Sequence, residues 1–401
     1  MKKPLTYFLS IVMILSFAAA ATGCAATQTS SSTAQTQTET ASAQTLSDSV
    51  SVSGSLIDSS TVFTDRDLAQ TADLSDAVYY TVSDGQDISI TQAGVYVISG
   101  TAQNCTITVE AADDAKVQLV LDGVDITNCD FPAIYVVSAD KCFVTTTDSD
   151  NSLAVTGTFT ADSTANTDAA IFSRSDLVLN GVGTLTVSST GNGVASKDDL
   201  TVTGGTYVIS ASKHGLEGKD SISVCGGTFT ISAAQDGLHS ENADDGTLGY
   251  IYISGGSFDI TAGDDGIHST AFAQIDGGEL TISAVEGVES TYVQINDGDI
   301  AISASDDGIN AAAKSQAYDV VIELNGGTIS IVMGSGDTDA VDANGSIYVN
   351  GGDISITALS AFDYDVTGEL NGGTVTVNGS HITEMTSSMG GGMKGMKGGR
   401  A

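Results

Sequence analysis

The sequence predicts an all-β fold: a three-faced parallel β-helix, or solenoid, with N-terminal capping strands. Two observations lead to this prediction. One segment recurs with a Gly-Gly or Asp-Gly pair at residues 204, 226, 255, 277 and 297, so the period is 20–22 residues with one longer unit. Each unit also holds three short apolar runs, which are separated by Gly-rich corners. Units this short cannot bury their own apolar faces, so they must stack on one another.

The individual apolar runs have the pattern of strands. The first run of each unit alternates apolar with small polar residues, which is typical of a half-buried strand. Tyr207, Phe229 and Phe258 occupy the same position in this run, so we expect them to fill the core together. Leucine-rich repeats have a similar length, but their leucine frame and helix are absent from the sequence. The solenoid is predicted to span residues 78–380.

Both ends of the chain are predicted to lie outside the solenoid. Residues 1–23 have the form of a bacterial lipoprotein signal peptide, with an apolar run too short to span a membrane comfortably. We expect Cys24, which follows a near-lipobox sequence, to be lipidated and to anchor the exported chain to the outer face of the cell membrane. Residues 24–77 are predicted to hold this anchor, a disordered Ser/Thr/Gln-rich tether and the start of the cap. Residues 381–401 are predicted to be a flexible Gly/Met/Lys tail.

Charge limits the partners of the chain. The formal net charge is −37, from 13 Lys and Arg against 50 Asp and Glu. Such a surface repels nucleic acid and anionic lipid, so we expect no nucleic-acid partner and contact with the membrane only through the lipid anchor. We expect a monomer. Cys105 and Cys129 are spaced near one coil, so they form either a stacked disulfide or buried free thiols, and no zinc-type cysteine spacing occurs.

Polar residues recur at a fixed place in each unit and predict a column. The residue ten positions after the start of the unit, or nine in the shortened fourth unit, is acidic in four units and His in the first: His214, Asp236, Asp265, Glu286 and Asp307. Each is followed by Gly and an aliphatic residue. Equivalent positions in successive coils lie about 4.8 Å apart. Asp264 and Asp306 precede two of these acids and add further oxygen donors.

The column is a candidate calcium site. Stacked carboxylates repel one another unless some are protonated or a cation lies between them. Calcium takes six to eight oxygen ligands, and the predicted ligands are Asp236, Asp264, Asp265, Glu286, Asp306 and Asp307. The alternative is that Asp-Gly is only a favoured turn dipeptide. A turn preference explains the Gly but not an acid in four of five coils, and both interpretations remain open from these residues.

Further motifs carry a family resemblance. Residues 118–128, 169–173, 196–200 and 218–220, together with the Gly-Gly and acid-Gly coils, resemble the bacterial family of carbohydrate-binding domain-containing proteins over residues 78–380. The resemblance implies a right-handed parallel β-helix similar to that of pectate lyases. It also implies bound calcium and binding of plant cell-wall polysaccharide, acidic or cellulosic, at the cell surface.

The sequence departs from the family pattern in several coils. Asn192 and His214 stand where the family usually has Asp, so metal sites are not carried over to these two coils. In the last two coils the same offset falls on Gly336 and Ala361. Acids near these positions would form sites of a different geometry: Asp337, Asp339, Asp342, Asp363 and Asp365.

The expected function is non-catalytic, calcium-dependent polysaccharide binding. Tyr250, Tyr252 and Tyr292 are predicted to be exposed for sugar stacking, with Lys213 as a polar contact. The alternatives are a polysaccharide lyase of the pectate type, or a structural or adhesive solenoid. A lyase needs a Lys or Arg base beside a calcium-bound uronate. Cations are few, and Lys213 beside His214 is the best candidate base, so we expect no enzymatic activity.

Overall fold

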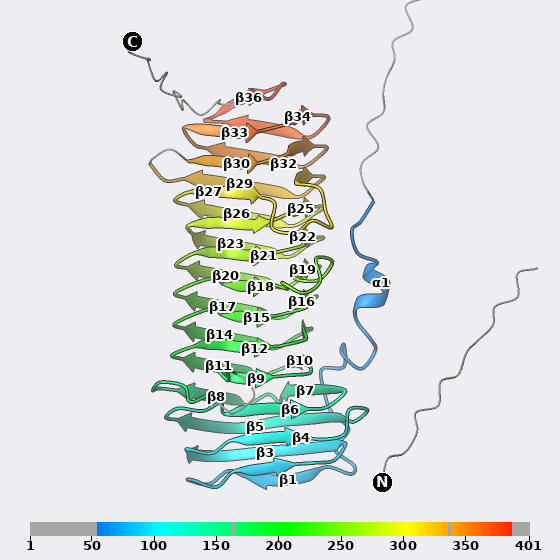
Figure 1. Ribbon diagram of the computed structural model, residues 1–401, viewed down its shortest axis with the longest axis vertical. Coiled ribbons are helices and arrows are strands. Elements are labelled where there is room, and N and C mark those ends of the chain that lie inside the picture. The colour runs from blue at the N-terminus through cyan, green and yellow to red at the C-terminus, as the bar shows by residue number, and fades with distance from the viewer. Residues whose placement is uncertain (1–53, 162–165, 336–337, 387–401) are drawn as a thin grey trace, which may run out of the picture. The chain divides into compact units, whose positions relative to one another are not determined.

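The computed structural model describes residues 54–161, 166–335 and 338–386. This part of the chain is nearly all-β, with strands stacked in successive coils (Figure 1). The predicted signal peptide, Cys24 and most of the predicted tail lie outside the described residues. No helix within the described ranges is long and apolar enough to cross a membrane.

Each regular coil contributes one strand to each of three parallel ladders, two of which merge into a 24-stranded sheet while the third forms a 12-stranded sheet. The first ladder contains β1 (Val78–Thr81), β3 (Gly94–Gln103), β5 (Lys116–Asn128), β7 (Lys141–Thr146), β10 (Asp176–Gly181), β13 (Asp199–Val202), β16 (Ser221–Val224), β19 (Tyr250–Ile253), β22 (Phe272–Ile275), β25 (Tyr292–Ile295), β28 (Val321–Leu324), β31 (Ser346–Val349) and β34 (Thr367–Leu370).

The second ladder continues from β5 through β8 (Asp150–Val155), β11 (Thr184–Ser189), β14 (Thr206–Ala211), β17 (Thr228–Ala233), β20 (Ser257–Ala262), β23 (Glu279–Ala284), β26 (Asp299–Ala304), β29 (Thr328–Met333), β32 (Asp353–Thr357) and β35 (Thr374–Val377). The third contains β2 (Ile88–Ile90), β4 (Ile107–Glu110), β6 (Ile134–Ser138), β9 (Ala169–Ser173), β12 (Asn192–Ser196), β15 (Leu216–Gly218), β18 (Leu238–Ser240), β21 (Asp265–Ser269), β24 (Glu286–Ser290), β27 (Asp307–Ala311), β30 (Asp339–Ala343) and β33 (Ser360–Tyr364).

The predicted parallel solenoid is therefore present, but the expected N-terminal capping strands are ordinary rungs of it. Strand β1 pairs in parallel with β3, and β2 pairs in parallel with β4. The long strand β5 spans two ladders, because its first half pairs with β7 and its second half with β8. At the other end β36 (Ser380–Ile382) folds back antiparallel to β35.

Stacked apolar side chains fill the inside of the coils. Tyr207, Phe229 and Phe258 are buried in one row, as predicted, with ring centroids 5.2 and 4.5 Å apart. The second Gly of each Gly-Gly pair makes the corner before this row: Gly205 and Gly227, for example, have φ values of 95° and 111°. Side chains rarely adopt such values, and this requirement explains the pairs from which the repeat was recognised.

Residues 54–74, which we call the N-terminal strap, lie against the first ladder (Figure 1). The strap contains the short helix α1 (Ser59–Val62). The side-chain oxygen of Gln274 accepts hydrogen bonds from the amides of Leu56 and Ile57 at 2.8 and 3.2 Å. Further along, Asp67 is buried and its carboxylate lies 3.3 Å from Lys141 Nζ. This part of residues 24–77 was predicted to be tether and the start of the cap, and the structure instead places it along the side of the coils.

Candidate metal-binding site

The acids of the predicted column lie in register at the third ladder. Asp265 pairs with Glu286, and Asp307 pairs with Asp339. The amide of Asp265 donates a hydrogen bond of 3.0 Å to Oδ1 of Asp236, which links these two neighbouring coils through the column. The fixed sequence offset therefore predicted a real alignment.

A hydrogen bond of the same kind recurs along the column. The amide of His214 donates to Asn192 Oδ1 at 3.1 Å, and the amide of Asp339 donates to Asp307 Oδ1 at 3.2 Å. The column side chain of one coil thus accepts from the backbone of the next. For an Asp, this contact engages one carboxylate oxygen, and the second oxygen remains to bind another group.

The Gly after each column acid is required by coil stacking rather than by a turn. A Cβ on Gly237 would lie 2.6 Å from the carbonyl oxygen of Gly266, and a Cβ on Gly266 would lie 2.6 Å from that of Gly287. These glycines are not among those with a positive φ. Asp265 and Asp307 are themselves strand residues, in β21 and β27. The turn interpretation of the Asp-Gly pairs is wrong for these coils.

A second polar column, which our sequence analysis missed, lies beside the first. Its members are in register along the third ladder: Glu217, His239, His268, Glu289, Asn310, Asp342 and Asp363. Each follows the aliphatic residue of the acid-Gly-aliphatic motif or its equivalent. That repeated position was a usable signal, because a strand residue next to a core aliphatic points outward.

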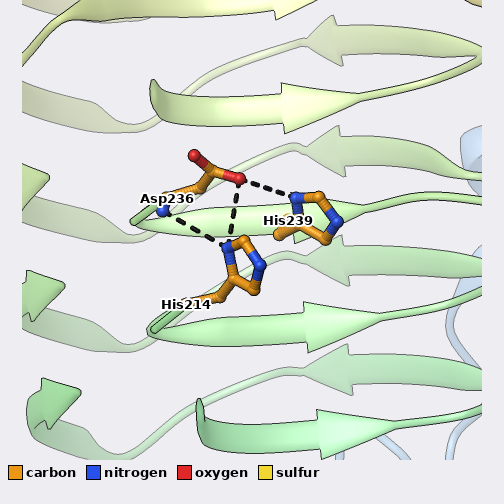
Figure 2. A group of neighbouring side chains, drawn as sticks. All are labelled: His214, Asp236 and His239. Carbon is orange, nitrogen blue, oxygen red and sulfur yellow. Dashed lines mark hydrogen bonds and ion pairs between the residues drawn. The ribbon is translucent and has the colours of Figure 1, made fainter. Parts of the chain in front are cut away.

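The two columns meet in three side chains, His214, Asp236 and His239, which we call the histidine cluster (Figure 2). Oδ2 of Asp236 lies 3.1 Å from Nδ1 of His214 and 2.6 Å from Nδ1 of His239. The two imidazole rings stack with centroids 4.0 Å apart. Burial alone would raise the pKa of Asp236, but hydrogen bonds with His214 and His239 outweigh it and hold the pKa well below its usual range.

One coil further lies the lysine-paired cluster, formed by Asp265, His268, Glu289 and Lys314. Nδ1 of His268 lies 2.7 Å from Oδ2 of Asp265 and 3.0 Å from Oε2 of Glu289. Lys314 Nζ lies 2.7 Å from Oε1 of Glu289. Burial alone would lower the pKa of His268, but the hydrogen bonds to both carboxylates raise it to about 10. The cluster therefore carries its own cations at neutral pH.

The coils of Glu286, Asp307 and Asp339, which we call the acid coils, carry a carboxylate in the first column, and two of them also carry one in the second, Glu289 and Asp342. Burial and the charges of Glu289, Asp265 and Asp307 raise the pKa of Glu286 to about 8. Burial and the neighbouring acids also raise the pKa of Asp307 to about 6 and that of Asp342 to about 7. These groups resist ionisation together, so a bound cation would stabilise their charged forms.

Other predicted ligands lie at the edge of this region or outside it. Asp264 and Asp306 are exposed beside their column neighbours. In the last coils the register places Asp339 and Ser360 in the column, so the prediction of Gly336 and Ala361 from a fixed offset was wrong. The loop between β29 and β30 is longer than the corresponding loop between β26 and β27, so the column residue lies further from the Gly-Gly pair than in earlier coils. Gly336 and Asp337 lie outside the described residues.

A third acidic group lies at a different corner. Asp176, Asp198 and Asp199 bring carboxylate oxygens within 4.8 Å of one another. Burial, followed by the charges of Asp199 and Asp198, raises the pKa of Asp176 to about 6. Asp198 and Asp199 belong to the 196–200 motif that carried the family resemblance, although the sequence had not indicated any of the three as a ligand.

The three tyrosines predicted to stack on sugar are not available for it. Tyr252 and Tyr292 are buried, with 1% and 9% exposure, and Tyr250 is half-buried. The N-terminal strap covers this region: Phe63 packs near Tyr252, and Leu56 and Ile57 pack on the cluster that contains Tyr292. The prediction failed because it assumed that nothing lies on this ladder.

Lys213, the other predicted sugar contact, retains 43% side-chain exposure but is paired with Asp168. The described cysteines Cys105, Cys129, Cys142 and Cys225 are free thiols. The stacked disulfide is therefore not formed.

Comparison with known proteins agrees with the family resemblance. The model of the family described as carbohydrate-binding domain-containing protein matches residues 84–337. A protein of the same description from Acetivibrio thermocellus is 35% identical over 126 residues, which cover 30% of this chain and 43% of that relative. A solved structure, described as the polysaccharide lyase-like protein from C. thermocellum in a gadolinium derivative, aligns with 24% identity and a TM-score of 0.42, covering 75% of this chain and 97% of that one. Because the family model matches more than half of its length, the chain belongs to the carbohydrate-binding domain-containing protein family.

Proposed function

We propose that this chain is a non-catalytic, calcium-dependent polysaccharide-binding protein of the cell surface that prefers acidic chains of the pectic type. Membership of the family supports polysaccharide binding in general, and its description names binding rather than catalysis. Calcium dependence and the preference for acidic sugars rest on the residues of the acid coils.

The observation that carries the proposal is the in-register run of half-buried carboxylates in the acid coils. Glu286 and Asp307 belong to strands paired through Val288 and Ile309, so their side chains leave neighbouring rungs. Adjacent rungs are about 4.8 Å apart, which is short enough for one ion to contact both carboxylates. The raised pKa values of Glu286 and Asp307 mark carboxyl groups that keep their protons more readily than usual, so a cation that binds there would take the place of a proton.

The donors present fit calcium. They are carboxylate oxygens, and calcium is a hard cation that binds oxygen. Glu286 and Asp307 would hold the ion, and the exposed Asp306 extends the set toward solvent. Asn310 Nδ2 donates a hydrogen bond of 3.0 Å to Oε2 of Glu286 and fixes its orientation. The group Asp176, Asp198 and Asp199 is a second all-oxygen candidate.

Bound calcium would supply a positive centre that a uronate carboxylate can join as a further ligand. The chain without an ion repels a polyanion, because its formal net charge is −37. Exposed carboxylates outside the ligand set, such as Asp264, then limit where an acidic sugar can approach. Since Tyr252 and Tyr292 are buried, ionic contacts rather than ring stacking carry the recognition.

The proposal also includes the handedness of the coil and the location of the protein. We infer a right-handed coil, because parallel crossover connections are right-handed in nearly all known cases. Lipidation of Cys24 would hold the folded part at the outer face of the membrane.

The test is retention of the full-length chain on immobilised polygalacturonate, with cellulose and a neutral glycan as parallel supports. We expect retention on polygalacturonate in millimolar calcium and release by EDTA. Glu286→Gln/Asp307→Asn should weaken binding by about tenfold or more, since each lost charge contact to calcium costs more than 1 kcal/mol. The matched control is Asp259→Asn/Asp299→Asn, which removes two exposed acids from β20 and β26 and should bind as the parent does. Retention that is equal in EDTA would refute the calcium dependence.

A further inference from the structure

The histidine cluster has donors that the calcium proposal does not use. Of its three side chains, two present imidazole nitrogens, and calcium disfavours nitrogen ligands. All three bring a ligand atom within 4.8 Å of the others: Nδ1 of His214, Nδ1 of His239 and Oδ2 of Asp236 (Figure 2). They come from two successive coils, because His214 precedes β15 while Asp236 and His239 belong to the next coil.

The two contacts of His214 Nδ1 within the cluster cannot both be hydrogen bonds. The amide of Asp236 donates to Nδ1 of His214 at 3.3 Å, so this nitrogen carries a lone pair in that contact. The same nitrogen lies 3.1 Å from Oδ2 of Asp236, which is also an acceptor. One nitrogen cannot accept from the amide and donate to the carboxylate at the same time.

We propose that His214, Asp236 and His239 bind a divalent transition-metal ion of the zinc type. Two neutral imidazoles and one carboxylate are a usual ligand set for such ions, with water or another group at the remaining position. The ion takes the lone pair of His214 Nδ1 and the charge of Asp236 together, so a cation then lies between the lone pair and the carboxylate oxygen, and the amide of Asp236 gives up its contact with Nδ1. This site is separate from the calcium sites of the acid coils and does not depend on them.

The distances require only a small adjustment. Metal–ligand bonds of about 2.0–2.1 Å in a tetrahedral arrangement place ligand atoms about 3.3 Å apart. The His214–Asp236 contact of 3.1 Å is already near this value, and the His239–Asp236 contact of 2.6 Å must widen. His239 is half-buried and its ring stacks between the rings of His214 and His268, so the widening is a small shift of the ring within that stack.

The surroundings also suit a metal ion. An open pocket of about 260 Å³ lies beside His239. Its lining includes Glu217 and Glu241, and its two lysines, Lys197 and Lys219, are each paired with a carboxylate. The other ring nitrogen of His239 lies 3.6 Å from Glu241 Oε2. A carboxylate near the distal nitrogen of a metal-binding His orients the ring and increases its basicity.

The direct test is calorimetric titration of the full-length chain with zinc chloride in the presence of millimolar calcium. We expect one strongly bound zinc ion per chain. His214→Asn should weaken zinc binding at least about 100-fold. Loss of a residue that only hydrogen-bonds to a metal ligand already weakens metal binding about 10- to 100-fold, and loss of the ligand itself costs more. This variant keeps the backbone ladder, because Asn192 already fills the same role one coil earlier. His381→Ala, which changes an exposed histidine of β36, is the matched control and should bind zinc as the parent does.

A second measurement identifies the ligands even where a variant is less stable. Copper(II) added to the parent should show electron paramagnetic resonance couplings to two imidazole nitrogens, and to one nitrogen in His214→Asn or His239→Ala. Retention on polygalacturonate in calcium should be unchanged in His214→Asn, which separates this site from the proposed function. No zinc binding by the parent, or equal binding by the parent and His214→Asn, would overturn the proposal.

Discussion

The histidine cluster and the lysine-paired cluster occupy neighbouring coils and differ in how their charge is neutralised. In the first, Asp236 lies between two imidazoles. In the second, His268 lies between two carboxylates, and Lys314 adds a positive charge at 2.7 Å from Glu289. The acid coils that follow carry Glu286, Asp307 and Asp342 with raised pKa values. Equivalent places in successive coils are thus neutralised in three ways: by a proposed zinc-type ion in the histidine cluster, by His268 and Lys314 in the lysine-paired cluster, and by proposed calcium in the acid coils.

The largest expected effect is that of calcium on the acid coils. Calcium that binds only the folded chain at about 100 times its dissociation constant adds about 2.7 kcal/mol. For a chain of this size we expect the melting temperature at pH 8 to rise by about 5 °C. The rise should be absent in Glu286→Gln/Asp307→Asn and intact in Asp259→Asn/Asp299→Asn, as measured by circular dichroism. A melting curve that does not respond to calcium would contradict the assignment.

The same effect should depend on pH. The pKa of Glu286 is raised to about 8 in the folded chain and is about 4.5 in the unfolded chain. Protonation of Glu286 in calcium-free protein therefore stabilises the folded state, and this contribution is complete at a pH below about 4.5. That contribution is lost as the pH rises through about 8. In EDTA the melting temperature should therefore fall between pH 5 and pH 8, and calcium should restore it mainly at the upper end. A calcium effect that is larger at pH 5 than at pH 8 would contradict this account.

A smaller effect should separate the two clusters that contain histidine. Lys314→Met removes the internal cation beside Glu289 and leaves Asp265, His268 and Glu289 without it. These three residues also bring their ligand atoms within 4.8 Å of one another. We expect calorimetry to detect a second, weaker zinc ion in this variant, and a loss of about 1 kcal/mol of unfolding free energy without metal. Unchanged zinc stoichiometry would show that Lys314 is not what distinguishes the clusters.

The regular features of the fold could be predicted from sequence because they repeat. Gly-Gly pairs such as Gly204-Gly205 fixed the period, and the constant offset to Asp236 and Asp265 predicted the column. The offset failed where the loop after β29 changed length, so that Asp339 took the place expected for Gly336.

The contact between the two columns was harder to predict. Residues that are three apart in a regular strand point to opposite faces. Asp265 and His268 nevertheless lie 2.7 Å apart, because the Asp sits at the start of β21, where the chain leaves the corner. The N-terminal strap was missed for a different reason. Its few apolar anchors, such as Leu56 and Phe63, stand in a Ser/Thr-rich segment whose average composition resembles a tether.

The smallest effect is expected at Lys213, the best candidate base for a lyase. Lys213 is paired with Asp168 and lies in the coil of His214, whereas the acid coils begin at Glu286. A base must lie within hydrogen-bond reach of the proton that it removes, so Lys213 is poorly placed to act on a uronate held at the acid coils. Asp168 is largely buried but also accepts a hydrogen bond from Asn166, and Lys213 is partly exposed, so the pair contributes about 1 kcal/mol to stability. Lys213→Ala should therefore bind polygalacturonate as the parent does, and neither protein should produce unsaturated product over long incubation with calcium, followed by ultraviolet absorbance. Product formation by the parent that is lost in Lys213→Ala would replace the binding function with catalysis, and it would place the reacting sugar beside the histidine cluster rather than at the acid coils.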